Sequence, residues 1–106
     1  MSSILAFIPD LMDRSRLKGI QNIIFVTTPK ELETAKSEDI VVVDLSRPFV
    51  MDAVANIKGR DNPPRIIGFG SHVDKEVLAD ARRLGCNQVL ARSAFFTRST
   101  ELLKTV

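Results

Sequence analysis

The sequence predicts an α/β protein in which helices cover both faces of a five-stranded parallel sheet. The first observation is residues 40–43, four consecutive β-branched residues, a run that is typical of a strand buried on both faces. The second is a strict alternation of short apolar runs with segments of helical character, five times along the chain. Short right-handed crossovers between parallel strands then favour a doubly wound sandwich.

Composition predicts one globular domain that spans residues 1–106. The chain is 44% hydrophobic and 26% charged, with a net charge of +2 and neither Tyr nor Trp, which argues against nucleic-acid binding. Its apolar runs are far shorter than the roughly 20 residues of a membrane span, so no membrane partner is expected. Without a recognisable secretory signal, and with Cys86 as the single cysteine, we expect a cytoplasmic protein.

Five apolar runs are the expected strands. The third run ends abruptly at Asp44, which places a carboxylate at the carboxyl end of the central strand. Open α/β sheets bind their ligands just beyond this end of the strands, so Asp44 marks the candidate site. The expected strands cover residues 4–8, 22–27, 40–43, 65–69 and 88–91.

The first helix is predicted to follow the first strand directly. Asp10 or Asp13 can cap it, and Gly19 is expected to end it after about ten residues. Leu11, Met12 and Leu17 are the candidates to face the sheet, and the arginines and lysine of the segment are expected to face water.

The remaining helices are also placed by their caps and their periodicity. Thr28 and Glu31 form a capping box for a helix that is over by residue 38. Residues 49–58 carry apolar side chains at helical spacing, Asp74 can cap the next helix, and Ser93 can cap the last. Together these elements predict a flavodoxin-like sandwich.

Three stretches carry a resemblance to a known family. Asp44 ends the third strand with Pro48 four residues on, residues 66–71 read IIGFGS, and residues 85–92 read GCNQVLAR. In these features, and over nearly its whole length, the chain resembles a response-regulator receiver domain, the CheY-like fold of two-component signalling. The resemblance implies the strand order 2-1-3-4-5, a signalling role and a protein partner.

The resemblance also implies a phosphoacceptor at Asp44, and an acidic pair at the end of the first strand that helps to bind Mg²⁺. In this sequence Ile8 and Pro9 occupy those paired positions, and Asp10 is only the next residue. Mg²⁺ requires near-octahedral oxygen coordination, for which Asp44 alone is a thin site. Asp10 and Asp44 are therefore the candidate metal ligands, and a metal-free domain is the other interpretation.

Further residues near this edge are candidates for binding phosphate or another anion. Gly70 replaces the hydroxyl residue that the family carries at the end of the fourth strand, with Ser71 one place further, and Arg92 replaces its lysine. Arg92 either senses phosphate or forms a bidentate ion pair with Asp44, which its planar guanidinium suits. Asp44 is either the phosphoacceptor or a structural carboxylate that caps nearby backbone amides or pairs with Arg92. Arg47 and His72 on neighbouring loops could join Arg92 in an anion pocket, so a small-molecule or anion sensor is a third hypothesis.

No catalytic machinery is predicted. Ser71 and His72 are adjacent in a loop and have no nucleophile-elbow motif around them. The glycines on either side of Phe69 do not follow the first strand, as a dinucleotide-binding motif would. Cys86 lies between a predicted helix and the fifth strand and is expected in the core. No second cysteine lies at metal-ligand spacing.

A docking face is predicted near the C-terminus. The resemblance implies that receivers dimerise or bind partners through the fourth helix, the fifth strand and the fifth helix. Phe95 and Phe96 are adjacent, so one of them is expected outside the core, either as a partner contact, since aromatic residues favour interfaces, or as a cover over the edge of the core. Strand five is the sheet edge, which proteins usually cover or pair. The candidate interface residues are Arg82, Arg83, Val89, Phe95, Phe96 and Leu103.

These observations favour an atypical receiver that lacks the acidic pair and acts as a phosphorylation-independent protein-interaction module, as a homodimer, without a cofactor or enzymatic activity. The alternative is a phosphorylatable single-domain response regulator that uses Mg²⁺ and has Asp44 as its phosphoacceptor.

Overall fold

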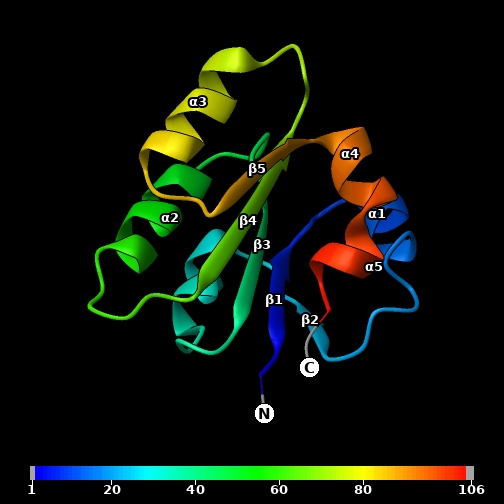
Figure 1. Cartoon of the computed structure of the whole chain (residues 1–106), viewed down its shortest axis with the longest axis horizontal. Coiled ribbons are helices and arrows are strands. Elements are labelled where there is room, and N and C mark those ends of the chain that lie inside the picture. The colour runs from blue at the N-terminus through cyan, green and yellow to red at the C-terminus, as the bar shows by residue number, and fades with distance from the viewer. Residues whose placement is uncertain (1, 105–106) are drawn as a thin grey trace.

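A computed structural model describes residues 2–104 and shows a five-stranded sheet in which every strand pair is parallel (Figure 1). The spatial order is β2-β1-β3-β4-β5, which confirms the predicted doubly wound, flavodoxin-like fold. The strands are β1 (Ile4–Phe7), β2 (Ile23–Phe25), β3 (Ile40–Asp44), β4 (Arg65–Gly70) and β5 (Gln88–Ala91).

Helices cover both faces of this sheet (Figure 1). One face packs against η1, α2 and α3, and the other against the α1 segment, α4 and α5. The helices are α1 (Leu11–Ser15), the 3₁₀ helix η1 (Pro29–Thr34), α2 (Val50–Lys58), α3 (Lys75–Arg83), α4 (Arg92–Thr97) and α5 (Ser99–Leu102).

Strand β3 lies at the centre of both cores. All five of its residues are buried, and alternate side chains point to opposite faces of the sheet. Val41 and Val43 pack with α2 and α3, whereas Ile40 and Val42 pack with the helices of the other face. A strand covered on both sides needs apolar side chains at every position, which explains the unbroken run.

The expectation that Leu11 and Met12 face the sheet is wrong. Asp10 caps α1 as predicted, accepting hydrogen bonds from the backbone of Met12 and Asp13 at 2.8 and 3.1 Å. The buried side chains of this segment are those of Asp13 in α1 and of Leu17, which lies in the turn after the helix and is buried as predicted. Leu11 and Met12 are 74% and 77% exposed.

Of the two arginines of this segment that are predicted to face water, Arg16 is exposed as predicted, whereas Arg14 is half-buried. The guanidinium of Arg14 lies 5.0 Å from the ring centre of Phe25, and its Nε donates to the carbonyl of Ile8 at 2.7 Å. The guanidinium of Arg16 lies 4.4 Å from the ring centre of Phe96. Both arginines therefore cover aromatic rings at the margin of the core.

Two later helices are shorter than predicted. The capping box is confirmed, since the Glu31 carboxylate accepts from the backbone amides of Thr27 and Thr28 at 3.1 and 3.0 Å and from both hydroxyls, which lowers the pKa of Glu31. The turn that follows is 3₁₀ and ends at Thr34. The C-terminal helix begins at Arg92 rather than after a Ser93 cap, and Arg98 divides it into α4 and α5.

Phe95 and Phe96 are both buried, at 0% and 7% exposure, so the prediction that one of them is available to a partner is wrong. Phe95 stacks on Phe69 with ring centres 4.8 Å apart, and Phe96 packs edge-on against both rings. Arg16 covers the Phe96 ring, and Leu103 is buried in the same cluster. Adjacent rings can both be buried because they meet edge to face in the corner between α4 and β4.

Candidate functional site at the carboxyl edge of the sheet

The sheet register brings the ends of four strands to one edge. Phe7 at the end of β1 is paired with Val43, and Asp44 at the end of β3 is paired with Phe69. Gly70 at the end of β4 is paired with Ala91, directly before Arg92. The segments that follow β1, β3, β4 and β5 therefore begin at this edge.

Asp44 is buried at the end of β3, and its carboxylate is held by the loop that follows. Oδ1 accepts hydrogen bonds from the backbone amide and the hydroxyl of Ser46 at 3.0 and 2.7 Å. Oδ2 lies 3.5 Å from Nε of Arg47. Such an Asx turn is a common local solution for an aspartate that begins a loop, because the side chain satisfies an amide two residues on.

Arg92 pairs with Asp13, not with Asp44 as one sequence hypothesis held. Its Nη2 lies 2.5 Å from Oδ1 of the buried Asp13. This hydrogen bond is the main cause that raises the pKa of Arg92, and the charges of Asp13, Asp44 and Asp10 add to it, whereas burial opposes it. The same guanidinium lies 5.7 Å from the ring centre of Phe69. Arg92 therefore joins the start of α4 to α1.

These carboxylates do not form a donor set that fits a divalent cation. Asp10 uses Oδ1 to cap α1, Asp13 binds a guanidinium, and Asp44 binds Ser46 and Arg47. Within residues 2–104, no three His, Cys, Asp or Glu side chains lie close enough together to hold a metal ion. A magnesium ion would have to compete with two arginine side chains for its ligands.

The predicted anion-binding residues contact carboxylates or lie in a loop. Arg47 and Arg92 each contact a carboxylate, and His72 is an exposed residue of the loop between β4 and α3. The hydroxyl of Ser71 accepts a hydrogen bond from the amide of Val73 at 3.4 Å, within the same loop. The groove described next is lined by Arg47 but by neither His72 nor Arg92.

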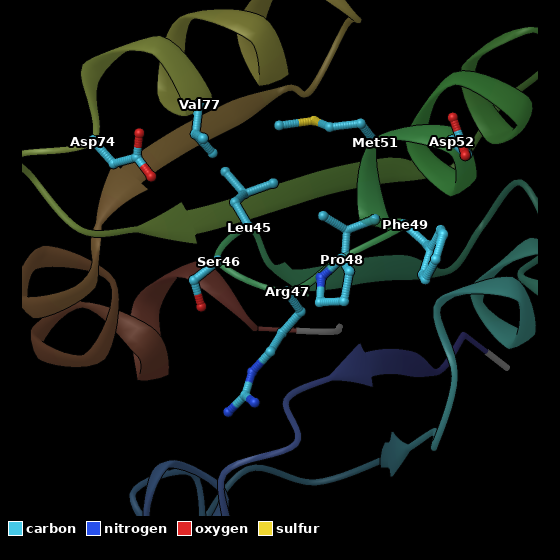
Figure 2. A pocket seen from close by; sticks show the side chains of 10 residues that line it. Leu45, Ser46, Arg47, Pro48, Phe49, Met51, Asp52, Asp74 and Val77 are labelled. Carbon is cyan, nitrogen blue, oxygen red and sulfur yellow. The ribbon is translucent and has the colours of Figure 1, made fainter.

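A groove of about 540 Å³ opens beside Asp44, between the starts of α2 and α3 (Figure 2). Leu45 forms its floor, with Met51 on one wall and Val77 on the other. Leu45 lies flat against β4 because Gly68 has no side chain: a Cβ there would lie 2.9 Å from Cδ1 of Leu45. The remaining lining residues are Ser46, Arg47, Pro48, Phe49, Val50, Asp52 and Asp74.

The predicted docking face near β5 retains only its polar and half-buried members. Arg82 and Arg83 are exposed on α3, and Arg83 pairs with Asp80 at 2.5 Å. Nη2 of Arg82 donates to the carbonyl of Val89 at 3.4 Å, on a strand whose four residues are all half-buried. The apolar members of the predicted face, Phe95, Phe96 and Leu103, belong to the core.

Sequence reasoning missed two features of this edge. Asp13 was expected only as a possible cap, although its four-residue spacing from the buried Leu17 indicates an inward position. The groove has no motif in the sequence, since its walls come from residues on two different helices.

In the part of the chain that the structure covers, no helix combines the length and the apolar character of a membrane span.

With this geometry in place, the chain can be compared with known proteins. A response regulator from Thermotoga maritima matches with a TM-score of 0.72 at 13% identity, over 99% of this chain and 99% of that one. The Mn²⁺-bound form of response regulator Rcp1 matches at 0.72 and 15% identity, over 98% and 96% of the two chains. A response regulator from Colwellia psychrerythraea matches at 0.71 and 16% identity, over 95% and 94%.

The chain therefore has the fold of a response-regulator receiver domain, the CheY-like fold that the sequence resembles. No protein-family model matches the sequence, and no curated protein does so either. At identities this low the structural likeness establishes the fold, and the function has to be argued from the residues.

Proposed function

We propose that this chain is a single receiver-like signalling domain that works by binding a protein partner, without phosphorylation of Asp44 and without catalysis. The observation that carries the proposal is the state of the three carboxylates at the carboxyl edge. Asp10, Asp13 and Asp44 each accept hydrogen bonds from protein groups, and two of them contact arginines. Phosphoryl transfer depends on positioning and charge neutralisation by metal ions, and a metal here would have to compete with the arginines that contact Asp13 and Asp44.

The matching fold supports the signalling half of the proposal. The similar structures are response regulators, and the match extends over almost the full length of this chain. We expect the protein to act in the cytoplasm and to contact another signalling component. Homodimerisation through the β5 edge, with Arg82, Arg83 and Val89, stays a separate prediction that sedimentation velocity over a range of protein concentrations would test.

The alternative is a phosphorylatable response regulator in which Asp44 accepts the phosphoryl group. One observation favours it: Asp44 ends the central strand at the carboxyl edge, and its Oδ2 has only the long 3.5 Å contact with Arg47. The solved response regulator Rcp1 binds Mn²⁺, and a metal here would use Asp44 and Asp10.

One experiment separates the two functions. Isotope-labelled protein is incubated with Mg²⁺ and a beryllofluoride phosphoryl mimic, and amide shifts are recorded by NMR; in parallel, intact mass is measured after incubation with acetyl phosphate. We expect no Mg²⁺-dependent shift changes around Asp44 and no phosphoryl adduct. Asp44→Asn and the exposed Asp52→Asn serve as the matched pair. An adduct that disappears in Asp44→Asn but persists in Asp52→Asn would establish the alternative.

A further inference from the structure

The groove between α2 and α3 combines an apolar floor and apolar walls with two acidic residues. The half-buried Met51 and Val77 supply the accessible apolar surface, and the buried Leu45 lies beneath them. Asp52 lies in the first turn of α2, and Asp74 occupies the position before α3. Both carboxylates are exposed, and neither accepts a hydrogen bond or forms an ion pair with any residue between 2 and 104.

Arg47 is the one cation among the lining residues, and it is directed elsewhere. Figure 2 shows its side chain extending away from Met51 and Val77, and its Nε contacts the Asp44 carboxylate at 3.5 Å. The charge that remains beside the apolar floor is therefore that of Asp52 and Asp74. A ligand that fills this groove meets a negative field on both sides.

Phe49 supplies a second, independent feature at the rim. Its ring is 76% exposed, and its backbone has φ +68°, in the left-handed region that costs a residue other than glycine about 1–2 kcal/mol. The ring lines both this groove and the neighbouring hollow beside η1. An exposed aromatic ring held on a strained backbone gains nothing for the isolated fold, whereas it suits a contact surface.

We infer that this groove binds a short peptide segment of a protein partner that carries one or two large apolar side chains flanked by Lys or Arg. The apolar side chains lie on Leu45 between Met51 and Val77, the cations face Asp52 and Asp74, and Phe49 covers the segment at the rim. The inference rests on the proposed function, because it names the chemistry of the partner that an interaction module requires.

The size of the groove favours a segment over a second copy of the chain. A stable dimer needs about 1,200 Å² or more of total buried surface, which requires a broad face. A groove of about 540 Å³ between two helix starts accommodates a few side chains of an extended or helical peptide instead. Peptide recognition of this kind relies on a few apolar contacts, with charge complementarity adding specificity and speed.

The test uses a blocked synthetic peptide with two leucines four positions apart, four lysines, and serine and glycine elsewhere. The full chain, labelled at its methyl groups, is titrated with this peptide at low salt. We expect saturable shifts of the Leu45, Met51 and Val77 methyls, and binding at least roughly tenfold weaker for the same peptide with glutamate in place of lysine. Raising the salt concentration should weaken binding of the lysine peptide.

Paired variants identify the groove as the site. Asp52→Lys with Asp74→Lys should weaken the lysine peptide roughly tenfold, whereas the matched double variant Glu38→Lys with Asp61→Lys, exposed acids at the other end of the sheet, should leave its affinity unchanged. Phe49→Ala should also weaken binding without lowering the free energy of unfolding.

Three results would each overturn the inference: no shifts in the groove, equal binding of the glutamate peptide, or groove shifts that depend on protein concentration without peptide, which would mark self-association. None of these readouts involves Asp44 or a phosphoryl mimic. Failure here therefore leaves the proposed phosphorylation-independent function standing, and an Asp44 adduct would leave the groove result unchanged.

Discussion

Arg92 and Asp13 are 79 positions apart in the sequence, and their side chains meet at 2.5 Å at the carboxyl edge of the sheet. The pair connects α1, near the N-terminus, to the start of α4, near the C-terminus. It also engages a carboxylate that lies next to the candidate site. Asp13 Oδ2, by contrast, is buried and has no hydrogen-bond partner among the described residues.

Asp13 is buried and Arg92 is partly exposed, so we expect unequal losses of stability when each partner is removed. Arg92→Met leaves Asp13 as a buried charge without a cation and should lower the free energy of unfolding by about 2 kcal/mol. Asp13→Asn removes the buried charge itself and should cost less, because Arg92 is partly exposed and can be hydrated. Urea denaturation of both variants and of the double variant measures the coupling. Equal costs for the two single changes would contradict this account.

We expect large losses of stability when either buried phenylalanine of the C-terminal aromatic cluster is truncated. Phe95→Ala and Phe96→Ala should each lower the free energy of unfolding by about 3 kcal/mol or more, since each removes a buried ring from contact with Phe69. The exposed Phe49 is the matched control, and Phe49→Ala should change stability by less than about 0.5 kcal/mol. A stable Phe96→Ala variant with altered self-association would restore the interface hypothesis.

We expect a substitution at Gly85 to lower stability through the backbone conformation. Gly85 follows α3 in a Schellman arrangement, in which its amide donates to the carbonyl of Arg82 and the Cys86 amide donates to the carbonyl of Ala81. Its φ of +105° is unfavourable for any residue with a Cβ, so Gly85→Ala should cost about 1–2 kcal/mol. Gly19→Ala should be nearly neutral, because a Cβ there meets nothing within 4 Å. Thermal unfolding of the two variants compares them directly.

Because Cys86 is buried, we expect the free energy of unfolding to depend on pH in the alkaline range. Burial raises the pKa of its thiol to about 11, opposed in part by the charge of Lys58, whereas an unfolded thiol titrates at about 8.5. As the pH rises through this window, the unfolded chain loses the proton that the folded chain still holds. The stabilisation is therefore complete below about pH 8.5 and is lost as the pH approaches 11.

The measurement compares the free energy of unfolding of the natural chain and of Cys86→Ala between pH 8 and pH 11. As the pH rises, the free energy of unfolding of the natural chain should fall relative to that of Cys86→Ala. The thiol should also react slowly with a disulfide reagent at pH 8 while the protein is folded, and quickly once it is unfolded. A fast reaction of the folded protein at pH 8 would contradict the burial that raises this pKa.

Much of the fold follows from patterns that are local in the sequence. The unbroken run at 40–43 requires cover on both faces, and the five strand–helix units allow few closed arrangements. The Thr28–Glu31 capping box was likewise predicted, and Asp10 was one of the two predicted caps of α1, because caps are formed by residues two to four positions apart.

The errors arose where distant segments meet. Leu11 and Met12 are exposed, whereas Asp13 of the same helix is buried and meets Arg92 from the other end of the chain. Phe96 is buried because Arg16 and Phe69 enclose it. For the same reason, neither the partner of Arg92 nor the groove beside Leu45 was predicted.

Local patterns in the sequence were enough to predict the strands, their parallel pairing and the position of Asp44 at the end of the central strand, since periodicity and strand–helix alternation depend on neighbouring residues. The folded structure was needed to show which carboxylate meets which arginine, that both phenylalanines are buried, and where an acidic groove opens. These are contacts between side chains far apart in the chain, and their energies depend on distance and burial, which no local pattern records.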